Sequence, residues 1–321
     1  MHESVSTNPQ RPPSESICTL FEGDYHMGLA ALTNSLVHAG YKGTVWVGYR
    51  GALPPWLDQL NGLDRQGAEY MVAGQIRLVF LLLETEIHFT SYKPQFMLDL
   101  FAGQARDSNY LWYFDPDIFL RCSWSFFTNW QRHGIALCQE IVTNIFPADS
   151  PLRHGWMEIA SGMGLGNPRA LNHYFNGGMV GISVAHKDFL RLWKSFIEIG
   201  QTKGGDISKI IAGSREFPFQ VLDQDAMNMA AMYTECPLST MGPEAMGFVP
   251  AGFTMYHAVG SKPWRGSLLM RALAGIPPSD AFKFFFTQSS SPIRAYSPWH
   301  LRCKQFACAV AALIGRFYHN T

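Results

Sequence analysis

Two aspartates separated by a proline, Asp115-Pro116-Asp117, are the first candidates for chemistry in this chain. They follow an apolar run, residues 110–114, which predicts a short buried strand that ends at Asp115. The backbone before a proline is extended, and side chains two residues apart on an extended chain point the same way. Two carboxylates against an apolar strand need positive charge between them, and Mg²⁺ or Mn²⁺ prefers such oxygen ligands. The alternative is a turn in which Asp115 caps the next element and Asp117 is solvated.

A second group of candidates lies much later in the chain, where His257, Gly260 and Lys262 precede Pro263-Trp264. A neutral imidazole can complete a metal site, and a glycine lets backbone approach a phosphate. A lysine adds a point charge for that phosphate. A single histidine is more often a core residue, but the three residue types together favour a ligand site.

Two further segments carry side chains that suit sugar hydroxyls, which need paired acceptors and donors. Asn176 and Gly177 precede an apolar run at 179–183, and Asp223 and Gln224 precede another at 226–232. The alternatives are a glycine turn at the first segment and a helix N-cap at Asp223.

The elements that must position these residues follow an α/β pattern. Strands are predicted at residues 17–21, 44–49, 76–83 and 110–114, with helices at 25–39 and 94–103 between them. This alternation predicts a mainly parallel sheet, and ligands bind beyond the carboxyl ends of such strands. Glu22-Gly23-Asp24 and Asp115-Pro116-Asp117 both fall at strand ends of this kind.

The remainder of the chain is less regular. A disordered leader is predicted at residues 1–15, a glycine-rich loop at 162–169, a strand at 177–183 and a helix at 188–200. Residues 204–213 and 237–252 are expected to be rich in loops. Beyond Trp264 the composition shifts, and helices are predicted at 268–274 and 300–317.

The composition limits the function classes. The formal net charge is 0, so no global field attracts nucleic acid. The six cysteines form no CxxC pair, which predicts free thiols in a reducing compartment. The polar, proline-rich N-terminus lacks the apolar region of a signal peptide, and no apolar run is long enough to span a bilayer. We therefore expect a cytoplasmic protein.

The order of these motifs, Glu-Gly-Asp-Tyr, Asp-Pro-Asp, Asn-Gly-Gly, Asp-Gln-Asp and His-x-x-Gly-x-Lys-Pro-Trp, resembles glycosyltransferase family 8 and its relatives. These are retaining GT-A enzymes that include glycogenin and the bacterial lipooligosaccharide galactosyltransferases. The resemblance covers residues 16–265 and implies a GT-A catalytic domain, a Rossmann-like α/β fold with a mainly parallel central sheet flanked by helices. Residues 266–321 would then form a helical C-terminal extension. Two departures are the single residue between Gly260 and Lys262, where the family often has two, and the long stretch from Lys93 to Asp115.

The resemblance also implies a role for each matching position. The metal ligands would be Asp115, Asp117 and His257, with Asp115 also near ribose or sugar, and Gly260 and Lys262 would bind the diphosphate. Thr19, Phe21, Glu22 and Tyr25 sit where the family holds uracil and ribose, although core packing is the alternative for Phe21 and Tyr25. Lys93 would face the donor's phosphate or sugar, with a solvated helix start as its alternative. Asn176, Gly177, Asp223 and Gln224 match the donor-sugar contacts, and we assign Asp223, Gln224 and Asn176 to catalysis.

The predicted activity is metal-dependent transfer of a hexose-type sugar, with retention, from a nucleotide-sugar to a glycan or lipid-linked glycan. Mn²⁺ or Mg²⁺ is the expected cofactor, and a uridine diphosphate donor is implied by the resemblance. Two alternatives stay open at this point. A nucleotide-sugar-forming nucleotidyltransferase would show a basic glycine-rich loop after the first strand, where this chain has acids. A non-catalytic binding module has little use for a complete set of metal and phosphate ligands.

The C-terminal segment mixes basic and aromatic residues, among them Lys283, Arg302, Trp299 and Phe306. Such a pattern is typical of a peripheral contact with an anionic membrane, where lipid-linked acceptors reside. A helix packed on the catalytic domain or on a second subunit fits the pattern equally well.

Overall fold

The computed structural model describes residues 14–63, 68–141, 145–203, 206–208, 218–250 and 252–318. The predicted leader lies outside the described residues except for its last two positions, and the first strand begins within it, at Glu15. The predicted loop at 204–213 also lies largely outside them.

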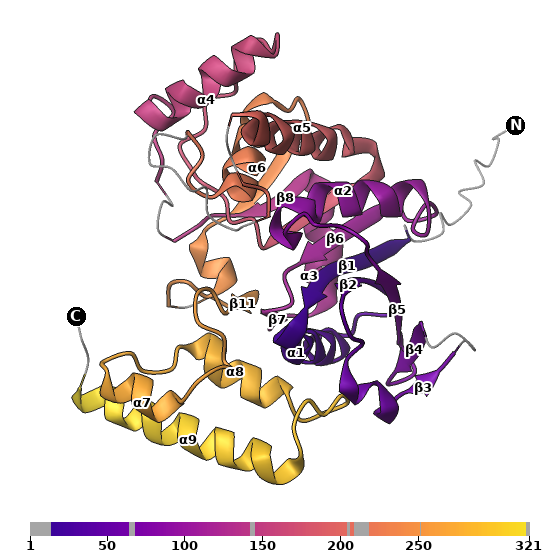
Figure 1. The fold of residues 1–321 in the computed structure, drawn as a ribbon, viewed down its shortest axis with the longest axis vertical. Helices are drawn as coiled ribbons and strands as arrows, with labels where there is room; N and C mark the ends of the chain where they lie inside the picture. The colour runs from indigo at the N-terminus through magenta and orange to yellow at the C-terminus, as the bar shows by residue number, and fades with distance from the viewer. Residues whose placement is uncertain are drawn as a thin grey trace, which may run out of the picture.

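A mixed sheet with a parallel centre organises the chain (Figure 1). Among the described residues its strand order is β10-β8-β9-β6-β1-β2-β5-β4-β3. The four central strands, β6, β1, β2 and β5, are parallel to one another, and β9 runs antiparallel to both β6 and β8. In chain order the strands are β1 (Glu15–Glu22), β2 (Gly43–Arg50), β3 (Asn61–Gly62), β4 (Glu69–Val72), β5 (Ile76–Leu82), β6 (Tyr110–Phe114), β8 (Ile135–Cys138), β9 (Met179–Ser183) and β10 (Leu238–Met241).

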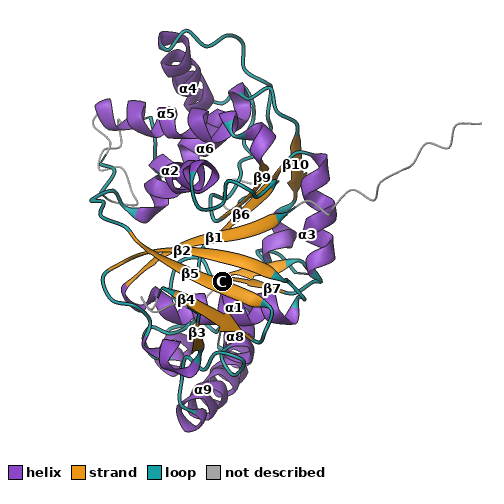
Figure 2. Cartoon of the chain, turned by 90° about the vertical axis from the view of Figure 1, so that its right-hand side faces the viewer, coloured by secondary structure: helices purple, strands orange, loops and turns teal. Residues whose placement is uncertain are grey.

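Helices cover both faces of this sheet (Figure 2). One layer holds α2 (Phe89–Ala102), α4 (Pro151–Gly162), α5 (Asp188–Thr202) and α6 (Leu222–Tyr233), and the other holds α1 (His26–His38) and α3 (Trp124–Trp130). Alternation along β1 supplies both cores: Cys18 and Leu20 join the α2 side, while Ile17 and Phe21 join the α1 side. Five short 3-10 turns are described, η1 (Gly23–Tyr25), η2 (Pro55–Gln59), η3 (Gln131–His133), η4 (Val184–His186) and η5 (Pro243–Met246).

A separate two-stranded sheet pairs β7 (Ile118–Leu120) with β11 (Met255–His257). β7 follows β6 after only three residues, Asp115-Pro116-Asp117, so this small sheet lies beside the carboxyl end of β6. It brings the late part of the chain back to the main sheet.

The C-terminal region is helical, with α7 (Leu268–Leu273), α8 (Asp280–Gln288) and α9 (Pro298–Phe317). α8 packs on α1 and β7, and the ring of Phe285 lies 5.6 Å from that of Phe119. The buried Asn34 of α1 donates to the backbone carbonyls of Gln288 and Ile293, which ties the two regions together. Among the helices of the described residues, none has both the length and the apolar character needed to cross a bilayer.

The structure confirms the predicted strands of the first half and the parallel sheet. The helix expected to begin at Pro94 instead begins at Phe89. The expectation failed because proline favours the first turn of a helix, whereas Pro94 lies inside α2. The sequence analysis did not predict β3, β4, β7, β8, β10, β11, α3, α4 or α8. All six cysteines are free thiols, as expected.

Candidate functional site

Strand pairing brings the Asp115-Pro116-Asp117 motif close to the motif that contains His257. β1 and β6 are parallel neighbours, so Glu22 and Asp115 leave the sheet at the same edge. The antiparallel pairing of β7 with β11 sets His257 opposite Ile118, the residue after Asp117. Segments that are far apart in the sequence thus meet at one end of the sheet.

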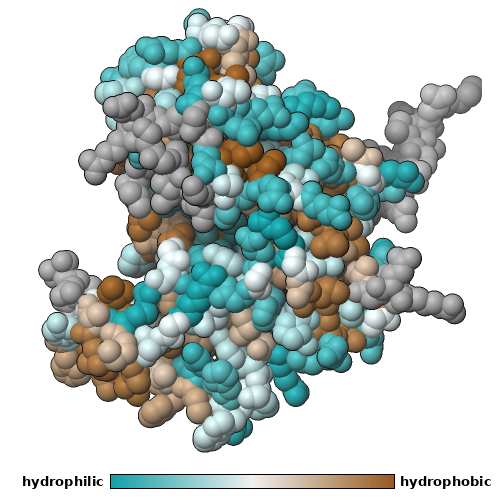
Figure 3. Space-filling model, in the orientation of Figure 1, coloured by the Kyte–Doolittle hydropathy of each residue, from teal (hydrophilic) through white to brown (hydrophobic). Residues whose placement is uncertain are grey.

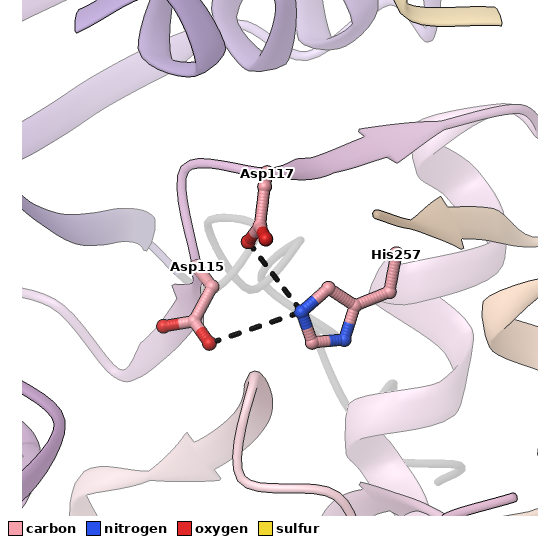
Figure 4. A group of neighbouring side chains, drawn as sticks. All are labelled: Asp115, Asp117 and His257. Atoms are coloured by element: carbon pink, nitrogen blue, oxygen red, sulfur yellow. Dashed lines mark ion pairs between the residues drawn. The ribbon is translucent and has the colours of Figure 1, made fainter. Parts of the chain in front are cut away.

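Asp115, Asp117 and His257 point toward a common centre (Figure 4). Nε2 of His257 lies 3.4 Å from Oδ1 of Asp117 and 4.0 Å from Oδ2 of Asp115. One ligand atom of each residue lies within 4.8 Å of the others. Asp117 and His257 are buried while Asp115 is partly exposed, so the cluster is closed behind and open toward solvent on one side.

Two glycines allow the surrounding backbone to approach this cluster closely. A Cβ on Gly178 would lie 2.5 Å from the imidazole of His257, and one on Gly28 would lie 2.4 Å from the carbonyl oxygen of Pro116. Both distances are below any normal contact. The carbonyl of Gly178 also accepts a 2.7 Å hydrogen bond from the backbone N–H of Asp115. A larger residue at Gly178 would displace the imidazole of His257, and one at Gly28 would displace the acidic loop.

The three side chains fit a hard divalent cation. Two carboxylates and one imidazole are a donor set that Mn²⁺ or Mg²⁺ can use. Nδ1 of His257 is buried and has no hydrogen-bond partner among the described residues, while Nε2 faces the carboxylates. Asp117 is 2% exposed. The alternative of a solvated Asp117 is therefore wrong, and the ligand role of His257 stays a prediction.

Lys262 neutralises Asp117. Its Nζ donates to Oδ2 of Asp117 and, over 3.0 Å, to the backbone carbonyl of Ala258. Burial alone would lower the pKa of Lys262, but the Asp117 carboxylate outweighs it and raises that pKa. Burial would raise the pKa of Asp117, yet His257 and Lys262 together hold it well below its usual range. The pair is ionised across the physiological range.

Lys93 neutralises Asp115, at the other side of the cluster. Its Nζ lies 3.1 Å from Oδ1 of Asp115, 3.8 Å from Oδ2 of Asp223 and 2.8 Å from the backbone carbonyl of Gly177. The residue is 2% exposed, so the solvated helix start is wrong. Burial works to lower the pKa of Lys93, but Asp115 and Asp223 raise it. One buried cation therefore links the metal cluster to the predicted sugar-binding residues.

A pocket with a cavity volume of about 210 Å³ opens beside the cluster. Most of the predicted ligand residues contribute to its wall, namely Phe21, Glu22, Tyr25, Lys93, Asp115, Asp117, His257, Gly260 and Lys262. Thr19 does not: it is fully buried two residues earlier in β1, on the α1 face of that strand. Phe21 also packs in the core against Phe80, so its core-packing alternative holds together with its place in the wall.

Two of the residues predicted to hold uracil and ribose, Glu22 and Tyr25, are themselves held in place by neighbours. Glu22 forms a 2.7 Å ion pair with Arg50. The ring of Tyr25 lies edge-on to Trp264, with ring centroids 5.5 Å apart. Tyr25 therefore presents a partly exposed aromatic ring beside Lys262, at a place where a planar base could stack.

Asn176, Gly177, Asp223 and Gln224 form a wall behind Lys93 rather than the lining of the pocket itself. Oε1 of Gln224 accepts a 2.8 Å hydrogen bond from the backbone N–H of Gly177. Asp223 is the second residue of α6 and not its N-cap, so that alternative is wrong. Burial and the nearby Asp115 raise the pKa of Asp223, although Lys93 opposes them. Gly177 does lie in a turn before β9, as its alternative expected.

Glu140 organises this wall and was not predicted from the sequence. Its Oε2 accepts 2.5 Å and 3.3 Å hydrogen bonds from the side-chain amides of Asn176 and Gln224. Glu140 follows the carboxyl end of β8, and Arg50 ends β2, so both obey the same strand-end rule. A prediction of β8 would have found Glu140. Further missed pocket residues are His88, Thr90 and Tyr113, whose hydroxyl donates a 2.7 Å hydrogen bond to Asp115.

The architecture is that of the GT-A fold, and solved structures of glycosyltransferases such as the following share it. The structure of the WbbM bifunctional glycosyltransferase matches 93% of this chain with a TM-score of 0.53 and 13% sequence identity. This chain spans about half of that one, 53%. An active-site mutant of LgtC, in which a glutamine is replaced by glutamate, matches 90% of this chain and 99% of its own, with a TM-score of 0.52 and 14% identity. No family model matches the sequence, and a search of curated proteins found no match.

Proposed function

We propose that this protein is a metal-dependent, retaining glycosyltransferase that moves a hexose-type sugar from a nucleotide-sugar to a glycan or lipid-linked glycan. The observation that carries the proposal is the convergence of Asp115, Asp117 and His257 with Lys93 and Lys262 in one pocket. That pocket lies at the carboxyl edge of a GT-A sheet, where nucleotides bind in folds of this kind.

The donor would lie along the pocket in three parts. Phe21, Glu22 and Tyr25 offer an aromatic and acidic end for a base and ribose, which we take to be uridine by resemblance to family 8. Lys262 and the backbone of Gly260 would bind the diphosphate. The wall behind Lys93, with Asn176, Gly177, Asp223 and Gln224, would hold the sugar hydroxyls. Thr19, which is buried and does not line the pocket, would contribute only to the layer of the protein on which the base rests.

The chemistry asked of the site is separation of charge at the anomeric carbon. When bound to Asp115, Asp117 and His257, Mn²⁺ or Mg²⁺ would supply positive charge against the departing diphosphate. Lys262 adds a fixed cation there without reorganisation, because Asp117 and Ala258 already hold its ammonium group. Gln224 has its amide fixed between Gly177 and Glu140, and we infer that it faces the sugar together with Asp223. LgtC also has a glutamine in its active site, the residue that is changed to glutamate in the mutant.

The division of the chain follows the resemblance. We propose that residues 16–265 form the catalytic domain and that residues 266–321 are an extension for acceptor, membrane or subunit contacts. The enzyme would work on the cytoplasmic side, where nucleotide-sugars are available to it.

A panel of nucleotide-sugars tests the proposal. We expect one uridine diphosphate sugar to raise Tm in the presence of Mn²⁺ and to be hydrolysed slowly without acceptor. Asp117→Ala should abolish both effects while the far-ultraviolet circular dichroism stays native, because it removes one of three ligand residues. His257→Ala should raise the Mn²⁺ concentration needed. Full turnover by Asp117→Ala, or by wild type in excess chelator, would refute the metal role.

The same panel separates the other functions. A nucleotidyltransferase would form nucleotide-sugar and release pyrophosphate from a nucleoside triphosphate and a sugar phosphate. A binding module would show the thermal shift with no hydrolysis at any time. Proton NMR of the transfer product decides the stereochemistry, since an α-linkage from an α-donor means retention.

A further inference from the structure

The outward face of α9 is apolar, contrary to the usual arrangement of a surface helix. Trp299, Phe306 and Leu313 are spaced seven residues apart and so lie on one side of the helix. Trp299 is 74% exposed, Phe306 72% and Phe317 85%. The opposite side, with Leu301, Cys308 and Ala311, is the buried one. α9 thus packs on the protein with one face and presents a second hydrophobic face to the outside.

Basic residues lie along one edge of this outward face, and no acid accompanies them. Arg302 and Arg316 are exposed and lie in one row along the helix, seven residues to either side of Ala309. Residues 281–321 contain no aspartate or glutamate. Within the part of the chain that the structure describes, neither arginine has a carboxylate within ion-pair distance. The face therefore combines aromatic rings with uncompensated positive charge.

We propose that the outward face of α9 lies on an anionic lipid bilayer, with Trp299, Phe306, Leu313 and Phe317 at the boundary between headgroups and acyl chains. Tryptophan rings favour this boundary, and arginines reach the lipid phosphates from it. A second copy of the chain is the poorer occupant. Pairing of two α9 faces would bury arginines against arginines with no carboxylate to neutralise them.

The surface continues onto α7. Met270, Leu273 and Ile276 are more than half exposed, and α7 packs against α9. Pro277, just beyond, lies against Gly315 near the end of α9. Figure 3 shows apolar side chains gathered at the lower left of this view, over α7 and the C-terminal half of α9.

An open groove leads from this surface to the candidate site. It has a cavity volume of about 590 Å³, and its wall runs from Lys262 through Arg265 and Arg271 to Ile276. Lys262 also lines the donor pocket. A lipid-linked acceptor held in the bilayer could reach the donor by this route, a consequence that rests on the proposed function. The docking itself does not.

Flotation of the full chain with vesicles tests the docking. We expect binding to phosphatidylcholine vesicles that contain about a third phosphatidylglycerol, and little binding to pure phosphatidylcholine. Arg302→Gln with Arg316→Gln should weaken binding about fivefold per charge, since each basic residue near an anionic surface contributes about that factor. Trp299→Ser with Phe306→Ser should abolish it. Leu82→Ser, which changes another well-exposed apolar residue, on β5, is the matched control and should float like wild type.

A second readout locates the contact. Cys303 is the exposed cysteine at the edge of the outward face, so it can be labelled selectively with an environment-sensitive fluorophore. Its emission should shift to the blue with anionic vesicles. The proposal would be overturned if wild type remained in the bottom fraction of the gradient or bound neutral vesicles equally well. Flotation of Trp299→Ser/Phe306→Ser would overturn it too. So would a dimer in light scattering that this double variant dissociates. None of these outcomes depends on sugar transfer.

Discussion

The candidate site and the outward face of α9 both contain basic side chains, but these are paired with carboxylates in the site and unpaired on α9. In the site, Lys93 lies within 3.8 Å of the carboxylates of Asp115 and Asp223, and Lys262 is paired with Asp117. On α9, Arg302 and Arg316 have no carboxylate partner among the described residues. The site's cations are buried and those of α9 are exposed.

The difference shows which charges belong to the fold and which are available to a partner. Removing a cation from the site strands a carboxylate in a low-dielectric interior, so Lys93 and Lys262 contribute to stability as well as to ligand binding. Removing one from α9 leaves nothing unpaired. Stability and binding should therefore separate cleanly between the two regions.

The largest expected effect is that of Lys93→Met. It leaves Asp115 and Asp223 without their shared cation, and we expect a loss of about 3–5 kcal/mol in the free energy of unfolding. Denaturant unfolding followed by tryptophan fluorescence measures it. Adding Asp223→Asn should recover part of the loss, because one stranded charge is then removed. A single variant as stable as wild type would show that Lys93 is not needed to balance these acids.

A smaller effect concerns Asp225, a buried carboxylate that receives only neutral donors. It accepts hydrogen bonds from the hydroxyl of Tyr174 and from the backbone N–H groups of Gln220 and Val221. Burial outweighs these bonds and raises the pKa of Asp225 to about 6. This is the reverse of Asp117, whose cations lower its pKa.

The folded state therefore binds the Asp225 proton more tightly than the unfolded state does. The resulting stability is present below about pH 4 and is lost as the pH rises through about 6, by about 3 kcal/mol in total. His26 and His88, whose pKa values burial lowers, act with the opposite sign in this window. The measurement is thus the difference in unfolding free energy between wild type and Asp225→Asn from pH 4 to 7. A difference that stays constant with pH would contradict the raised pKa.

The sequence was sufficient for the four parallel central strands, β1, β2, β5 and β6, and for the polar residues at their carboxyl ends. The run at 76–83, apolar except for Arg77, marks a strand whose middle residues, 78–80, are buried on both faces, and the alternation with helices sets the strands parallel. Asp115 and Glu22 could be placed at one edge for that reason. His257 could be joined to Asp117 only by resemblance, because its position depends on the pairing of β7 with β11, a contact between distant segments.

The second half was less predictable because its elements are short and lack periodicity. β8 has four residues and β11 three, too few to show alternation. Missing β8 meant missing Glu140, the residue that holds Asn176 and Gln224. α8 was missed because three consecutive phenylalanines obscure its helical period, although Asp280, Lys283 and Thr287 form an exposed polar face and Phe285 and Phe286 are buried in the structure. Which of the C-terminal aromatic residues face outward became clear only from the packing of α9 in the structure.

The smallest expected effect is on α9 and completes the comparison. Arg302→Gln with Arg316→Gln should change the free energy of unfolding by no more than about 0.5 kcal/mol, because exposed side chains without partners contribute little. The check is denaturant unfolding beside Lys93→Met under the same conditions. If the arginine variant lost several kcal/mol instead, these side chains would have a partner within the protein. Their charge would then serve the fold, as that of Lys93 does, and the two regions would not differ in kind.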